Sequence, residues 1–288
     1  MDEKTRKSIL EAQKNELTEY HIYNNLAAST KDEHNKKILK HIAKDELRHH
    51  NFWKTHTNQK VQPNRFKIWM YKWIARILGL TFGLKLMENG EDLAQSNYDK
   101  IAKVIPEVKR IEKDENEHER NLINMINEKK LDYAGSMVLG LNDALVELTG
   151  AIAGLTLAFQ NIRLVGIASL VTGIAASLSM AASEYLSTKT EGDDKNPFHA
   201  SFYTGIAYIF TVAFLVIPYF VLDNIFVALA TTLGIAVLII LLFTYYISVA
   251  KDYNFKKRFW EMTLISLGVA AISFLIGLAI RHFLNIEI

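Results

Sequence analysis

Five long apolar runs in the second half of the chain constrain its fold more than any other feature of the sequence. Each run contains about 20 residues, which is the length that an α-helix needs to cross the hydrocarbon core of a bilayer. We therefore expect an integral membrane protein whose partner is the lipid bilayer. The predicted spans are Met137–Phe159, Leu164–Leu186, Ser201–Leu222, Ile225–Ala250 and Met262–Phe283.

The first two runs carry candidate metal ligands. Asp143 and Glu147 are four residues apart and share one face of the first predicted helix, and Met180 and Glu184 share a face of the second. Ionisable groups at the centre of a membrane cost about 2.5–3.5 kcal/mol each on insertion scales, so they usually mark an ion path. Carboxylates with a thioether can bind a divalent transition metal. The alternative is that the acids are helix-end groups that reach back to the headgroups.

Small residues continue both of these faces. Gly150 and Gly154 extend the first face, and Ser169 and Gly173 extend the second. Such faces allow helices to approach closely, so we expect the two to meet. The short turn Gln160–Arg163 predicts an antiparallel hairpin, which places both ligand pairs on the same side of the membrane.

Composition separates a charged first half from this apolar second half. The 288 residues are enough for two domains, and we expect them at 1–130 and 131–288. The absence of cysteine excludes disulfides, iron–sulfur clusters and thiolate zinc sites. A net charge of +2 gives no indication of nucleic-acid binding. Met1–Lys7 is charged and lacks the apolar core of a cleavable signal, so the first domain should stay in the cytoplasm.

Four helices with short connections are predicted before the membrane half, and they favour a four-helix bundle. Pro106 suits the first turn of the fourth helix, and Pro63 marks the break after the second. The expected fold class is all-α, with a cytoplasmic four-helix bundle followed by a five-helix transmembrane domain. The predicted bundle helices are Glu3–Ser29, Lys31–His56, Leu78–Lys103 and Pro106–Lys129.

Each bundle helix has at least one carboxylate on its apolar stripe, and two helices repeat one motif. Asp-Glu-Leu-Arg-His at 45–49 matches Asp-Glu-Asn-Glu-His at 114–118. Buried carboxylates need a partner or a metal. One Glu from each of two helices with Glu-x-x-His from each of the other two is the di-iron arrangement. The alternative is that these acids lie on solvated helix faces, which would not account for the repetition of the motif. The candidate ligands are Glu16, Glu46, His49, Glu88 or Glu91, Glu115 and His118.

At these residues the chain resembles the rubrerythrin and ferritin-like family, over roughly 3–127. The resemblance implies a di-iron site from the candidate ligands, and rubrerythrins use two acids of the third helix. Tyr23 lies seven residues after Glu16 and Tyr98 seven after Glu91, which favours Glu91 as the symmetric partner. Rubrerythrins also carry a cysteine-ligated iron domain that delivers electrons. The lack of cysteine therefore argues against peroxidase activity fed by such a domain.

A basic amphipathic segment, Phe66–Leu86, lies between the second and third bundle helices. Its tryptophans and lysines suit a membrane interface, and its scattered basic residues disfavour a span. Apolar packing within the bundle, or in a dimer, is an equal alternative.

The run Gly-Leu-Asn-Asp-Ala-Leu-Val-Glu at 140–147, followed by Gly150 and Gly154, resembles the first span of the vacuolar iron transporter family. Met-Ala-Ala-Ser-Glu-Tyr-Leu at 180–186 resembles the end of its second span, and the likeness covers about 135–280. It implies a homodimer with a pore between the first two helices of both subunits. By position, Asp143 and Met180 carry over as translocation ligands, and Glu147 and Glu184 as further metal or proton sites.

Plant members of that family place a helical metal-binding domain between the second and third spans, where this chain has only Ser187–Ala200. We expect the bundle to take that role, so the whole chain resembles the membrane-bound ferritin-like proteins. The expected function is export of ferrous iron or manganese from the cytoplasm in exchange for protons. The alternative is a membrane-anchored di-iron ferroxidase or peroxide reductase, although an anchor needs neither five spans nor acids within them.

Loop charges predict the orientation of the membrane domain. Lysines at 129 and 130, and the basic residues at 251 and 256–258, fall on one side of five spans, so that side is cytoplasmic. The amino terminus is then inside and the carboxyl terminus outside. With no targeting segment, a prokaryotic plasma membrane is the simplest location.

Overall fold

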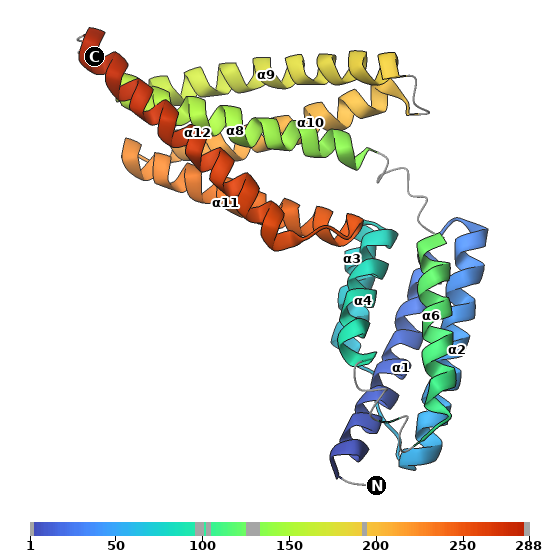
Figure 1. Ribbon diagram of the computed structural model, residues 1–288. Helices are drawn as coiled ribbons and strands as arrows, with labels where there is room; N and C mark the ends of the chain where they lie inside the picture. The colour runs from blue at the N-terminus through green and yellow to red at the C-terminus, as the bar shows by residue number, and fades with distance from the viewer. Residues whose placement is uncertain (1–2, 96–100, 102–104, 125–132, 192–194, 285–288) are drawn as a thin grey trace. The chain divides into compact units, whose positions relative to one another are not determined.

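The computed structural model describes residues 3–95, 101, 105–124, 133–191 and 195–284, and the regular structure among them is helical (Figure 1). The chain divides into two compact units, Met1–Glu128 (unit 1) and Lys129–Ile288 (unit 2). Each unit has a hydrophobic core of its own. The expectation of an all-helical chain is confirmed over these residues.

Unit 1 contains the predicted helices with small shifts at their starts. The second helix begins after Asp32, whose side chain accepts a hydrogen bond from the Asn35 amide and caps it. Pro106 lies in a turn before the fourth helix rather than inside its first turn, because the Val108 amide bonds to the Ile105 carbonyl. The observed helices are α1 (Glu3–Ser29), α2 (Glu33–Thr57), α3 (Arg65–Leu78), α4 (Leu80–Gln95) and α6 (Val108–Asn124).

Helix α3 is an element that the four-helix prediction did not separate from its neighbour. Gly79 breaks the segment with φ of 104°, a backbone conformation that favours glycine, so α4 starts at Leu80 instead of Leu78. The predicted continuation of α4 to Lys103 falls largely outside the described residues. Helix α3 packs against both α1 and α4, which supports the bundle-packing alternative for one of its faces.

A polar layer in unit 1 lies between two apolar clusters. Along α1, Ile9 belongs to one cluster and Ile22 to the other, with Glu16 between them. The same order recurs on α2 and α6, where the Glu-x-x-His motifs lie between buried apolar residues. Fully burying one Leu or Ile side chain stabilises a fold by about 1.5–3 kcal/mol, so these clusters can offset the cost of burying the polar layer.

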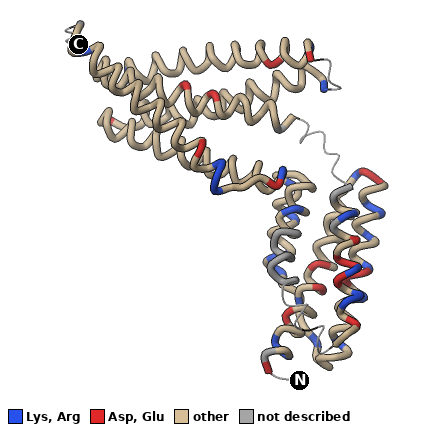
Figure 2. Tube along the Cα trace, viewed as in Figure 1, with Lys and Arg blue, Asp and Glu red and all other residues tan. Residues whose placement is uncertain are grey.

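Unit 2 consists of five long apolar helices, each of sufficient length and composition to cross a membrane. Figure 2 shows these helices almost entirely in tan, with few charged residues along them. The five predicted spans are therefore confirmed as helices. Their bounds are α8 (Ala134–Phe159), α9 (Ile162–Glu191), α10 (Pro197–Val221), α11 (Ile225–Lys251) and α12 (Phe255–Leu284).

The small-residue faces of α8 and α9 do not meet each other, contrary to the expectation from sequence. A Cβ on Gly150 would approach Val269 of α12, and one on Gly173 would lie 2.6 Å from Val212 of α10. Helix α8 makes its most extensive contacts with α12, and α9 with α10. The hairpin itself is confirmed, because only Gln160 and Asn161 separate α8 from α9. The close approach therefore packs α8 against α12 and α9 against α10.

Candidate metal centre and membrane acids

Three helices of unit 1 bring five of the predicted ligands together. Helix α1 supplies Glu16, and each Glu-x-x-His motif supplies a pair because residues three apart on a helix share a face. Glu16, Glu46, His49 and Glu115 each offer a ligand atom, and these atoms lie within 4.8 Å of one another. His118 faces the same carboxylates from α6. All five side chains are shielded from solvent.

The carboxylates of Glu46 and Glu115 lie between the two histidine rings, whose centroids are 6.0 Å apart. The two oxygens of Glu46 lie 3.7 Å from His49 Nδ1 and 3.3 Å from His118 Nδ1. Those of Glu115 lie 3.1 Å and 3.5 Å from the same two nitrogens. Each carboxylate therefore directs one oxygen toward each histidine.

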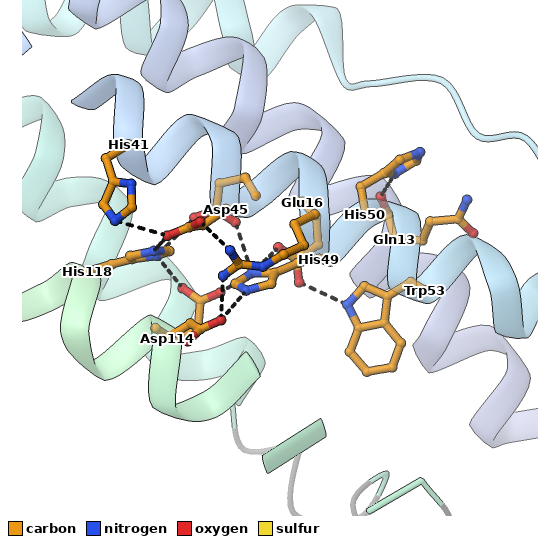
Figure 3. A network of polar contacts seen from close by, with 12 residues as sticks. Gln13, Glu16, His41, Asp45, His49, His50, Trp53, Asp114 and His118 are labelled. Carbon is orange, nitrogen blue, oxygen red and sulfur yellow. Dashed lines mark hydrogen bonds and ion pairs between the residues drawn. The ribbon is translucent and has the colours of Figure 1, made fainter. Parts of the chain in front are cut away.

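An outer layer of charged side chains fixes the direction of both rings (Figure 3). Asp114 Oδ2 lies 3.2 Å from His49 Nε2, and Asp45 Oδ2 lies 3.2 Å from His118 Nε2, so each motif's aspartate holds the other motif's histidine. Arg48 joins the two aspartates at 2.8 Å and 2.7 Å. Anchoring Nε2 in this way leaves Nδ1 directed at the carboxylates, as in histidines that bind metal.

Burial and mutual contact shift the protonation of this cluster. Burial and the neighbouring Glu115 raise the pKa of Glu46 well above its usual range. Although burial lowers the pKa of His118, its contacts with Glu115 and Glu46 raise it to about 11. Burial likewise opposes ionisation of Glu115, but the two histidines lower its pKa to about 2. The contacts with the carboxylates therefore favour the protonated form of both histidines when no metal is bound.

Several ligand atoms at the centre of this cluster have no hydrogen bond of regular geometry. They include His49 Nδ1, His118 Nδ1 and Glu46 Oε2, all buried. Leaving a buried polar atom unsatisfied costs about 1–3 kcal/mol, so an arrangement that concentrates such atoms at one point needs compensation. Imidazole and carboxylate ligands suit divalent first-row metals. The residues present therefore fit a metal centre.

Glu88 and Glu91 lie on α4, but their side chains are outside the described part of the structure, so their predicted ligation stays a prediction. Sequence reasoning assigned no role to Asp45 and Asp114, although the repeated Asp before each Glu was the available signal. It also missed Glu19, three residues after Glu16 on the same face of α1. Burial and the charges of the cluster glutamates raise the pKa of Glu19 well above its usual range.

The acids of α8 lie on a row that the described residues of unit 2 leave partly uncovered. Glu147 is exposed and Asp143 is half-buried, and Leu139, one turn earlier, is 49% exposed. Glu147 Oε2 accepts a hydrogen bond of 3.0 Å from the Tyr208 hydroxyl of α10. Tyr208 is 61 residues away in sequence, and no local pattern could have identified this contact.

Met180 and Glu184 are both half-buried on α9. Met180 packs against the apolar core of unit 2, and Glu184 Oε1 accepts a hydrogen bond from Ser136 Oγ in the first turn of α8. Among the described residues of unit 2, no three His or acidic side chains bring their ligand atoms within 4.8 Å of one another. A single chain therefore does not gather the membrane acids into one cluster.

Residues 134–196 match the VIT family. The matched segment comprises α8, α9 and the connection to α10, and so includes all four predicted ligands of the membrane half. No curated protein matches the chain significantly. Together with five helices of membrane-spanning length, the family match supports a VIT-type membrane domain in an integral membrane protein.

Proposed function

We propose that this chain transports ferrous iron or manganese across a membrane, using the acids of α8 and α9 as the ion path. The observation that carries the proposal is the VIT family match over the two helices that hold Asp143, Glu147, Met180 and Glu184. Carboxylates with one thioether prefer a divalent transition metal to calcium or magnesium. Transport is the function that explains why such ligands occur within membrane-spanning helices.

The pore is completed by a second copy of the chain. An ionised carboxylate that faces lipid is costly, so the exposed position of Glu147 requires a cover. A twofold axis that brings the α8 and α9 faces of two copies together would provide that cover. It would also gather acids that one chain leaves dispersed. The transporter is therefore a homodimer whose path lies between the subunits.

Hydrogen bonds within each subunit position two of the acids. The Tyr208 hydroxyl holds Glu147, and the Ser136 hydroxyl holds Glu184. Carboxylates must lose their protons before they bind a cation, so metal binding and protonation compete. Protons that arrive from an acidic far side would displace the metal there, which makes exchange of metal for protons the expected mode. Loop charges favour a cytoplasmic position for unit 1, and export from the cytoplasm is the direction that we propose.

Unit 1 is proposed to be a ferritin-like bundle that holds two ions of the same metal. Glu16, Glu46, His49, Glu115 and His118 would hold the ions, together with Glu88 or Glu91 of α4. A bound ferrous pair could supply oxidation chemistry in addition to storage or sensing. The buried cluster of Glu16, Glu46, His49 and Glu115 favours a second candidate function, a ferroxidase or peroxide reductase anchored by unit 2.

Metal flux in proteoliposomes tests the transport proposal. Asp143→Asn keeps the shape of the side chain and removes its charge, so the variant should insert normally yet lose most of its initial Fe²⁺ flux. Asp223→Asn is the matched control, because Asp223 is exposed in the α10–α11 connection. Normal flux through Asp143→Asn at equal protein density would refute the pore and favour the anchored enzyme.

A further inference from the structure

Helix α3 has an apolar face that the described residues of unit 1 do not cover. Its inner face is used in the bundle, where Ile68, Tyr71 and Ala75 pack against the core. The opposite side carries large apolar side chains at one-turn or two-turn spacing, each between 42% and 67% exposed: Phe66, Trp69, Trp73 and Ile77. An exposed aromatic patch of this kind marks an interaction site rather than ordinary surface.

The charge of α3 has a single sign. Every charged residue in its sequence is basic: Arg65, Lys67, Lys72 and Arg76. Lys67, Lys72 and Arg76 are all exposed, and the Arg76 guanidinium lies 5.6 Å from the ring centroid of Trp73. Cations therefore flank the uncovered aromatic face. A complementary surface would be negatively charged and would accept aromatic rings.

The α3 face is held rigidly by the bundle. A Cβ on Gly83 of α4 would lie 3.0 Å from Ala75 Cβ, so α3 and α4 are in close contact. The Asn64 side chain caps α3 by accepting a hydrogen bond from the Lys67 amide, and the Asn64 amide donates to Thr18 Oγ1 of α1. The basic and aromatic side chains are consequently presented on a preformed surface.

We propose that the exposed face of α3 docks on an anionic lipid surface. Tryptophan with lysine and arginine on one helix face is the composition of helices that lie at the headgroup boundary. Only nine residues, 125–133, separate the end of α6 from the start of membrane helix α8. Such a connection reaches at most about 35 Å, so unit 1 is always within reach of the bilayer that holds unit 2. This docking is independent of what unit 2 transports.

Spin labels on the full chain test the proposal, and the absence of native cysteine allows single labelled sites. Trp69→Cys and Ile77→Cys place labels at two points of the face, and Lys44→Cys places a control on an exposed position of α2. Each protein is reconstituted in nanodiscs of phosphatidylglycerol or of phosphatidylcholine. Power saturation then compares collisions with oxygen, which enters lipid, and with a water-soluble nickel chelate.

In phosphatidylglycerol, both α3 labels should be several-fold more accessible to oxygen than to nickel, while the Lys44→Cys label shows the reverse. Replacing Lys67, Lys72 and Arg76 by Gln should return the α3 labels to water. The charge-matched control replaces Lys109, Arg110 and Lys113 on α6, which are also exposed, and should leave them in lipid. Two label positions keep the test valid if one substitution disturbs folding.

Two results would overturn the proposal. The first is an α3 label as accessible to nickel as the control label in anionic discs, which would mean that the face stays in water. The second is a label shielded from both reagents, with dipolar broadening that disappears on dilution with unlabelled protein. That pattern would identify a second copy of the chain as the occupant.

Discussion

At the scale of single residues, the aspartate of each Glu-x-x-His segment in unit 1 orients the histidine of the other segment. Asp114 of α6 orients His49 of α2, and Asp45 of α2 orients His118 of α6. Arg48 forms ion pairs with both aspartates and so links the two segments. The direction of each ring therefore depends on the packing of the opposite helix, and metal affinity should respond to residues that touch no metal.

Replacing Asp114 by Asn tests this arrangement. The amide carries no negative charge, so it cannot stabilise the protonated ring of His49 as the carboxylate does. The His49 ring should therefore be less firmly oriented and less basic. We expect Fe²⁺ affinity of the unit 1 centre to fall roughly 10–100-fold, with the helical spectrum unchanged. Titration of the anaerobic full-length protein measures the change. Glu117→Gln, an exposed substitution three residues along α6, is the control, and equal affinities in the two variants would contradict the assignment.

Proton release should accompany metal binding at the same centre. Burial lowers the pKa of both histidines, but contacts with the carboxylates raise that of His118 to about 11 and also raise that of His49. Both rings therefore hold protons that a metal must displace, so affinity should rise with pH, by up to about 100-fold per unit for two protons. Calorimetry in buffers of different ionisation enthalpy counts the protons. Affinity that stays constant between about pH 6 and 8 would exclude the linkage.

At the scale of elements, features that depend on a local sequence pattern could be predicted, whereas tertiary contacts between helices could not. The apolar stripe of α6 predicted that Glu115 and His118 are buried, because the positions that face the core recur at a regular spacing along a single helix. The glycines of α8 predicted a close helix contact but not its partner. The spacing identifies the face that carries small residues, but it does not identify the helix that packs against that face. The predicted start of the third bundle helix at Leu78 lies close to the observed start at Leu80, but the predicted segment Phe66–Leu86 ran across Gly79 because an amphipathic pattern continues there, and the φ of 104° is visible only in the fold.

Two glycines of unit 2 offer a test of close packing. A Cβ at Gly173 would lie 2.6 Å from Val212 Cγ1, and the branched Val212 side chain has little freedom to move. Gly173→Ala should therefore lower the stability of unit 2 by about 1–3 kcal/mol. Gly234→Ala on α11 meets no atom within 4 Å and should be neutral or slightly stabilising. Thermal unfolding in one detergent compares them, and equal midpoints would show that α9 and α10 are not in close contact there.

At the scale of the whole molecule, two units whose candidate metal ligands are arranged differently share one chain. Unit 1 concentrates its ligands in a buried cluster, whereas unit 2 disperses its acids along two helices. A buried cluster suits retention of metal, and dispersed ligands suit passage, because an ion must leave each site for the next. The charge difference between the halves was enough to separate the units from sequence. Cooperation between them can be detected only in the intact protein.

Glu115→Gln separates the two roles. The amide weakens a bridging position in unit 1 and leaves the acids of α8 and α9 unaltered. If unit 1 supplies metal to the pore, this variant should keep its maximal flux at saturating Fe²⁺ and lose most of it at low Fe²⁺, which appears as a raised KM. Initial flux is measured against Fe²⁺ concentration at matched protein density, with Glu117→Gln as the control. A concentration dependence identical to the control's would show that unit 1 does not feed the pore. Loss of flux at every concentration would instead indicate that the unit 1 centre gates the pore, since supply alone can be overcome by saturating metal.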